Sequence, residues 1–158
     1  MKGTEIQDSI LVGFYKSKPL AITNYSGITG YEGDVMMVSP SGFVTEYEVK
    51  TSRADFKKDF SKVSKHNRLK KPNAPSKSWG YPYAPNYFYY VCIDGLIKKD
   101  EVPAYAGLIY IVGGIPVIII KAKRLHNHKL AQPLKDRIGR TLSLRTIFGS
   151  SYLRHKHK

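Results

Sequence analysis

A strand, a turn, a second strand and a helix signal follow one another in the first third of this sequence, and this succession restricts the fold more than any other feature. The segment 34–38 (DVMMV) is short and apolar, and 39–42 (SPSG) is typical of a hairpin turn. The segment 43–51 predicts the second strand. Ser52 stands three residues before an aspartate, which is the spacing of a capping box with Asp in place of Glu or Gln. We therefore expect a β-hairpin that leads directly into a helix.

Hydrophobic periodicity predicts further elements on both sides of this hairpin. Helices are expected over 4–15, from Ser52 to about Arg68, and over 133–148. Additional strands are expected over 86–93, 107–112 and 115–121. The aromatic segment 86–93 is typical of a central strand, and two glycines predict a tight turn between the last two strands. The order of elements predicts a single α/β (α+β) domain over 1–150, followed by a basic tail over 151–158.

The charge balance suggests a polyanionic partner. The chain has 26 Lys and Arg against 12 Asp and Glu, a formal net charge of +14. Such an excess on a globular domain most often accompanies nucleic-acid binding, although a ribosome-associated protein or a membrane-surface binder would show it too. A hydrophobic fraction of 42% excludes a wholly disordered polycation.

The cysteine count and the apolar segments indicate a cytoplasmic protein. Cys92 is the single cysteine, so one chain cannot form a disulfide, and a reducing compartment is the simplest expectation. The first residues lack the apolar core of a signal peptide. The longest apolar stretch, 107–120, is shorter than the roughly 20 residues that span a bilayer. No membrane association is therefore expected.

Acidic residues are scarce but concentrated around the hairpin. Glu32, Asp34, Glu46 and Glu48 fall within seventeen residues. Because side chains alternate along a strand, Glu46, Glu48 and Lys50 are expected to share one face. The hairpin would then place Asp34 beside them.

Two carboxylates and a lysine at one place match the needs of phosphodiester hydrolysis. Mg²⁺ is typically held by one or two carboxylates together with waters and substrate oxygens. The bound metal polarises the phosphoryl group and activates a water, and a nearby lysine can hold that water or stabilise developing negative charge. The same residues could instead form ordinary ion pairs on an exposed strand face, which is the more frequent use of a Glu-x-Lys sequence.

The motifs around this cluster resemble the PD-(D/E)xK nuclease superfamily. The matching residues are Gly33-Asp34-Val35 for the first half of the motif and Glu48-Val49-Lys50 for the second. The proline that names the motif is replaced here by Gly33, a change that the superfamily tolerates. The continuation 50–56 (KTSRADF), with Lys65-His66 further on, is similar to small bacterial and phage members linked to DNA repair. The resemblance extends over roughly residues 30–112.

This resemblance implies a fold, an activity and a set of ligands. The fold would be a restriction-endonuclease-like core, a central mixed sheet flanked by helices. The activity would be Mg²⁺- or Mn²⁺-dependent DNA cleavage, with Asp34, Glu48 and the carbonyl of Val49 as metal ligands and Lys50 as the catalytic lysine. Many members add an acid from the first helix, for which Glu5 is the candidate, ahead of Asp8. Glu46 could reach a second metal ion or simply pair with a lysine.

The basic residues after the hairpin are candidates for contact with DNA phosphates. They are Arg53, Lys57, Lys58, Lys62, Lys65, His66 and Arg68. The predicted helix has an apolar face formed by Phe56, Phe60 and Val63, and the basic residues occupy the rest of its surface. These basic residues could equally be a solvated helix surface with no DNA contact. The aromatic loop 79–83 could stack on bases or pack against the sheet edge.

The favoured function is a DNA endonuclease acting on duplex or branched DNA in repair, recombination or phage DNA metabolism, in the cytoplasm of a bacterial or phage-infected cell. Two alternatives remain open: a non-catalytic DNA-binding accessory protein with the same fold, and a basic RNA-binding protein with a structural acid cluster. A homodimer is expected if both strands of a symmetric substrate are cut.

Overall fold

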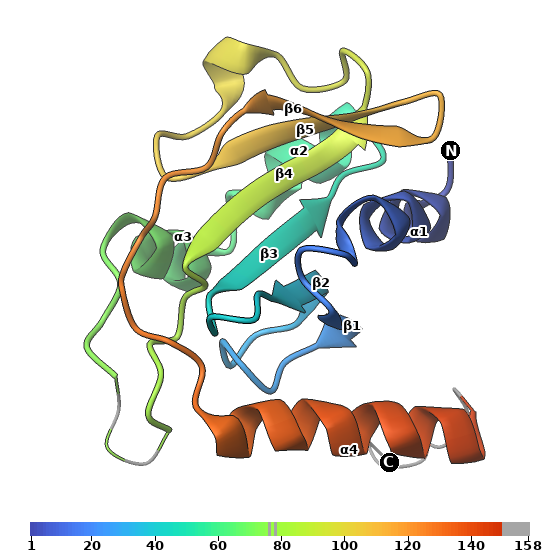
Figure 1. Ribbon diagram of the computed structural model, residues 1–158. Coiled ribbons are helices and arrows are strands. Elements are labelled where there is room, and N and C mark those ends of the chain that lie inside the picture. Colours follow the sequence, from blue (N-terminus) through green and yellow to red (C-terminus); the bar gives the residue numbers. More distant parts are fainter. Residues whose placement is uncertain (76, 78, 150–158) are drawn as a thin grey trace.

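In the computed structural model, which describes residues 1–75, 77 and 79–149, one mixed sheet of six strands lies between helices (Figure 1). The strands are β1 (Leu20–Tyr25), β2 (Gly33–Val38), β3 (Val44–Val49), β4 (Tyr87–Ile93), β5 (Gly107–Val112) and β6 (Ile115–Ile120). The helices are α1 (Gly3–Phe14), α2 (Arg53–Asp59), α3 (Val63–Lys70) and α4 (Gln132–Phe148), with a 3₁₀ turn η1 (Lys99–Glu101). The predicted α+β class is thereby confirmed.

The order of the strands in the sheet is their order in the chain. β1–β2, β2–β3 and β5–β6 are antiparallel pairs, whereas β3–β4 and β4–β5 are parallel. A parallel pair needs a crossover connection, and α2 and α3 form the crossover between β3 and β4. The expected central position of β4 is confirmed, as are the hairpin of β2 with β3 and the glycine turn between β5 and β6.

One face of the sheet is covered by α1. Ile6 and Ile10 of this helix are fully buried against residues of β2 to β5, including Tyr47 and Val49. Phe14 stacks on Tyr47 with ring centroids 5.5 Å apart. The helical spacing of these apolar residues in the sequence therefore corresponds to the buried side of α1.

The opposite face carries two separate apolar clusters. In one, Phe56 of α2 and Leu69 of α3 pack on β4 and β5. In the other, Leu134 and Ile138 of α4 pack with side chains of β1, β2 and β3. Glu46, Glu48 and Lys50 are buried side chains that point to this same face, as strand alternation predicts.

The helix expected from Ser52 to about Arg68 is two helices, so that prediction is wrong. Ser52 does cap α2, because its side chain accepts a hydrogen bond from the N–H of Asp55. The helical backbone stops after Asp59 and resumes at Val63. This interruption changes the orientation of the second helix, so that Val63 is exposed. The buried side chains of α3 are Lys65, His66 and Leu69.

The remaining difference concerns β1, which was not predicted. Its sequence, LAITNY, contains polar residues, and it is the edge strand beside β2. The predicted tail 151–158 lies outside the described residues. Within the described part of the chain, no helix has the length and apolar character needed to cross a membrane.

Candidate functional site

The register of the β2–β3 hairpin places Asp34 beside the end of β3. Val35 is opposite Tyr47, and the strands are antiparallel. The backbone N–H of Val49 donates a hydrogen bond to Oδ2 of Asp34 at 2.8 Å. The predicted proximity of Asp34 to the Glu48–Lys50 segment is therefore confirmed, and it follows from pairing between two strands that are adjacent in sequence.

Glu48 is the centre of a buried network of charges. Lys50 Nζ donates to its Oε1 at 2.8 Å, and Lys65 Nζ donates to its Oε2 at 2.7 Å. Lys62 Nζ lies 3.4 Å from Oε1. Glu48, Lys50 and Lys65 are each at most 5% exposed. Both carboxylate oxygens of Glu48 are thus bound by ammonium groups, one from Lys50 just after the end of β3 and one from Lys65 of α3.

Asp59 at the end of α2 completes the surroundings of Lys50. Its Oδ1 accepts a hydrogen bond from Lys50 Nζ at 3.1 Å, and its Oδ2 accepts one from the hydroxyl of Tyr90 at 2.9 Å. Burial opposes its ionisation, but the positive charges of Lys65 and Lys50 hold the pKa of Asp59 below its ordinary value. Sequence reasoning did not assign Asp59 to the site, because the predicted continuous helix gave no reason for an acid at that turn to face the sheet.

Glu46 is wholly buried, and within the described part of the chain only one of its two carboxylate oxygens has a hydrogen-bond partner. Its Oε2 accepts a hydrogen bond from the hydroxyl of Tyr31 at 2.7 Å. Its Oε1 has no hydrogen-bond partner among the described residues, and the nearest cation, Lys65 Nζ, lies 3.7 Å away. Burial raises the pKa of Glu46 to about 7, and Glu48 and Asp34 add to this rise while Lys65 opposes it. Tyr31, in the loop before β2, was also not predicted.

Asp34 has a raised pKa as well. Burial and the negative charge of Glu48 raise its pKa to about 6, although the N–H of Val49 and the charge of Lys50 act in the opposite direction. Asp34, Glu46 and Glu48 therefore repel one another in a partly desolvated place. A bound divalent cation would relieve this repulsion.

The donor atoms available at this place suit Mg²⁺ or Mn²⁺. Asp34 and Glu48 supply hard carboxylate oxygens, and Val49, the residue after Glu48, supplies a backbone carbonyl. Oε1 of Glu46 is a buried oxygen that has no hydrogen-bond partner among the described residues. No group of three His, Cys, Asp or Glu side chains in the described residues is already arranged as a metal site. In this structure the ammonium group of Lys65 neutralises the carboxylates instead.

Glu5, the acid of α1 that was the candidate for a further metal ligand, does not lie in the carboxylate cluster. Glu5 is exposed, and its Oε2 accepts a hydrogen bond from the N–H of Lys2 at the start of α1. Asp8 is exposed too. The α1 side chain that reaches the site is Gln7, whose Nε2 donates to the backbone carbonyl of Asp34 at 3.3 Å. The placement of Glu5 as a helix cap does not support its predicted role as a ligand.

The predicted DNA-contacting residues fall into different environments. Lys57, Lys58 and Lys62 are exposed, and their contact with DNA stays a prediction. Arg53 forms a bidentate ion pair with Glu101. The remaining residues are half-buried or buried: Arg68, Lys65 and His66.

The exposed positions expected for Lys65 and His66 are wrong. Lys65 is inside the carboxylate cluster. His66 is hydrogen-bonded to the hydroxyl of Tyr105 and to the backbone carbonyl of Asp59. These partners keep both side chains largely buried, at 5% exposure each, instead of on a solvated helix surface.

The aromatic loop packs on the protein rather than projecting from it. Trp79 Nε1 donates to the carbonyl of Ile28 at 2.7 Å, and its ring stacks with that of Tyr83. Tyr81 is fully buried and donates to Oδ1 of Asn86. Of the two alternatives for this loop, packing at the sheet edge is the one that these contacts favour.

Comparisons with known proteins support the fold alone. No family model and no curated protein matches this sequence. The fold is similar to that of a solved structure, the SPO1766 protein of unknown function from Silicibacter pomeroyi, with a TM-score of 0.64 and 17% sequence identity. The match covers 99% of this chain and 94% of that chain.

Proposed function

We propose that this chain is a metal-dependent DNA endonuclease of the PD-(D/E)xK type, with a restriction-endonuclease-like core. One observation carries the proposal: the carboxylate of Asp34 is hydrogen-bonded to Val49, between Glu48 and Lys50, whose side chains are themselves 2.8 Å apart. Two hard anionic ligands and a lysine thus meet at the ends of two paired strands, an arrangement that suits metal-dependent phosphodiester hydrolysis.

Each residue has a defined part in this proposal. Asp34, Glu48 and the carbonyl of Val49 would hold a Mg²⁺ or Mn²⁺ ion, which when bound supplies a Lewis acid and a water of lowered pKa. Lys50 would hold the attacking water or stabilise negative charge on the phosphate. Asp59 binds the same ammonium group and so keeps Lys50 in place if Glu48 turns to a metal.

Lys65 is the group that a metal ion would displace. Its ammonium group is 2.7 Å from Glu48 Oε2 and 3.7 Å from Glu46 Oε1, the carboxylate oxygens that Lys50 does not bind. Two cations cannot share these oxygens without strong repulsion. Metal binding is therefore expected to compete with Lys65, and not with Lys50.

Cleavage assays with near-isosteric variants test the proposal. Asp34→Asn keeps an acceptor for the N–H of Val49 but removes a charged ligand, and Lys50→Met removes the ammonium group. Each is expected to reduce Mg²⁺- or Mn²⁺-dependent cleavage of supercoiled, branched and single-stranded DNA by at least about 100-fold. Glu101→Gln and Lys98→Met, which change the same charges outside the site, serve as matched controls, and circular dichroism checks folding.

Metal binding is measured separately by titration calorimetry with Mn²⁺. Asp34→Asn should weaken binding, and Lys65→Met should strengthen it because the competing ammonium group is gone. A ligand that binds only the native state also raises the melting temperature. If Mn²⁺ at millimolar concentration neither binds nor stabilises the unmodified protein or Lys65→Met, the proposed metal site is wrong.

A non-catalytic DNA-binding accessory protein is the alternative that one observation favours. Both oxygens of Glu48 are already neutralised by lysines, and such a network can stabilise the fold without any metal. Binding of DNA by the unmodified protein, with no cleavage of any of the three substrates in either metal, would establish this alternative instead.

A further inference from the structure

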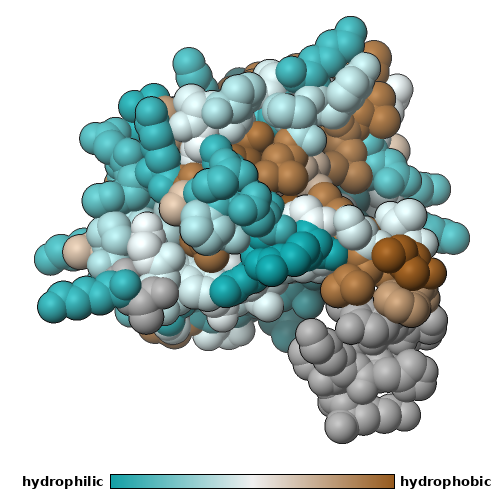
Figure 2. Space-filling model, turned by 60° about the horizontal axis from the view of Figure 1, so that its bottom comes forward, coloured by the Kyte–Doolittle hydropathy of each residue, from teal (hydrophilic) through white to brown (hydrophobic). Residues whose placement is uncertain are grey.

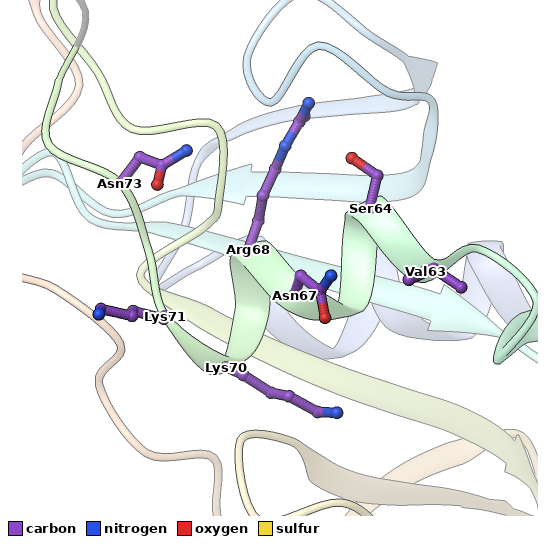
Figure 3. Close-up of a pocket in the computed structure, with 7 residues that line it drawn as sticks. All are labelled: Val63, Ser64, Asn67, Arg68, Lys70, Lys71 and Asn73. Atoms are coloured by element: carbon purple, nitrogen blue, oxygen red, sulfur yellow. The ribbon is translucent and has the colours of Figure 1, made fainter.

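The outer side of α3 borders a broad basic hollow. It has a volume of about 900 Å³, and its lining includes three cationic side chains together with hydroxyl and amide groups (Figure 3). These are Arg68, Lys70, Lys71, Ser64, Asn67 and Asn73. No carboxylate is among its lining residues. Lysine, arginine, serine and asparagine side chains are the groups that proteins commonly use to bind phosphate oxygens.

A second hollow connects this surface to the carboxylate cluster. Its volume is about 470 Å³, and it shares Ser64 and Arg68 with the first. Tyr31 and Lys65 also line it, and these two residues bind Glu46 and Glu48 directly. The second hollow therefore joins the surface of α3 to two residues that contact the carboxylate cluster.

Arg68 stands at the junction of the two hollows and is held there by the protein. Its guanidinium group lies over the ring of Tyr83 at 5.4 Å and donates to the carbonyl of Thr29 at 3.5 Å. A side chain that is already ordered loses less entropy when it binds a ligand. Figure 3 shows Arg68 projecting from the helix on the same side as Ser64, whereas Lys70 projects from the opposite side.

We propose that the sugar-phosphate backbone of DNA lies along α3, in contact with Arg68, Lys70 and Lys71, and enters the site past Tyr31 and Lys65. The identity of the polyanion as DNA rests on the proposed function. The exposed lysines of α2, Lys57 and Lys58, line neither hollow, so this proposal assigns them a smaller contribution to DNA binding than Lys70 and Lys71. The contacts are with phosphates, so the binding is expected to depend on salt and not on base sequence.

Two double variants of equal charge separate this surface from a general effect of net charge. Lys70→Gln/Lys71→Gln removes two positive charges from α3, and Lys57→Gln/Lys58→Gln removes two from α2. All four lysines are exposed, so both variants are expected to fold. Fluorescence anisotropy with a short labelled duplex, in EDTA to prevent cleavage, gives the affinity over a range of KCl concentrations.

The α3 variant is expected to weaken binding about 10- to 100-fold at low salt, and to reduce the slope of log K against log salt by about 2. The α2 variant should change the affinity by less than about threefold, with little change in that slope. Equal weakening by the two variants, or no DNA binding by the unmodified protein, would overturn this proposal. Binding along α3 without cleavage in Mg²⁺ or Mn²⁺ would leave it standing and would overturn only the proposed nuclease activity.

Discussion

Buried charges distinguish the centre of this protein from an ordinary apolar core. Glu48 and Lys50 are separated by one residue of β3, and each has further charged partners from α2 or α3. Replacing such a network with apolar side chains is often neutral or stabilising, whereas removing a single partner typically costs about 3–5 kcal/mol. A stable fold alone therefore does not require a network of this kind, whereas loss of one member of the network should destabilise the protein.

The pH dependence of stability should report on Glu46. Its pKa in the folded protein is about 7, above the ordinary value of 4.5, so the native state binds more protons than the unfolded state between these pH values. Stability then falls as pH rises from about 4.5 to 7, by up to roughly 3 kcal/mol for this group. Glu46→Gln is neutral at every pH, so above pH 7 it should be more stable than the unmodified protein in urea denaturation with EDTA.

Glu101 provides a control whose stability should change with pH in the opposite direction. The hydrogen-bonded ion pair with Arg53 lowers the pKa of Glu101 to about 2, below its ordinary value of 4.5. This half-buried carboxylate therefore stabilises the folded state above pH 4.5 and loses that effect as pH falls. Glu101→Gln should consequently be destabilised at neutral pH rather than stabilised. A Glu46→Gln variant whose stability relative to the unmodified protein does not change between pH 4.5 and 8 would contradict the raised pKa.

Strand alternation made part of the site predictable at the level of single residues. Asp34, Glu46, Glu48 and Lys50 lie on adjacent strands of one hairpin, and a period of two determines which side chains share a face. Asp59 and Lys65 enter the site only because the helix is interrupted between them. That interruption depends on packing against the sheet, which the local sequence pattern does not contain.

Close contact between two elements, α1 and β6, depends on a glycine. A Cβ atom placed on Gly13 would lie 2.3 Å from Cγ of Pro116, a ring that cannot rotate away. In an open helical position, replacing glycine with alanine usually stabilises by about 0.5–1 kcal/mol. At Gly13 we expect the reverse, because α1 must shift from β6, with a loss of about 1–3 kcal/mol in the free energy of unfolding.

Gly139 of α4 supplies the matched control. A Cβ atom there would meet no other atom within 4 Å, so Gly139→Ala should stabilise the protein by about 0.5–1 kcal/mol. Urea denaturation of both variants measures the difference. Stabilisation by Gly13→Ala as well would mean that α1 does not pack closely on β6.

The elements themselves were predictable where the local pattern agreed with the tertiary packing. The periodic apolar residues of α1 and the apolar segments of β4, β5 and β6 were sufficient to locate them. β1 was not found because its polar residues, among them Asn24 with a positive φ of 47°, weaken the strand pattern. Hydrogen bonding to β2 stabilises β1 despite this weak pattern. That pairing joins residues on the two sides of a loop, so the residues of 20–25 alone do not reveal it.

At the scale of the whole molecule, apolar and charged regions are distributed unevenly. The sheet face opposite α1 holds two apolar clusters, and the carboxylate and lysine side chains are buried on this same face. Much of the face in Figure 2 is hydrophilic, with some apolar side chains gathered near the centre of that view. Ile147 and Phe148 at the end of α4 are exposed apolar side chains as well. The surface positive charge thus surrounds a buried group of acids.

This distribution predicts how salt affects stability. A net charge of +14 makes the folded chain repel itself, and added salt screens exposed charges while leaving buried pairs such as Glu48–Lys50 nearly unchanged. Raising NaCl from about 20 to 300 mM should therefore stabilise the protein. A gain of about 1 kcal/mol in the free energy of unfolding would appear as a rise of about 2–4 °C in Tm. If duplex DNA binds the native state as proposed, it should also stabilise the protein at low salt, and this effect should disappear at high salt. A fall in Tm with NaCl would show that exposed ion pairs, such as Arg53 with Glu101, outweigh the general repulsion.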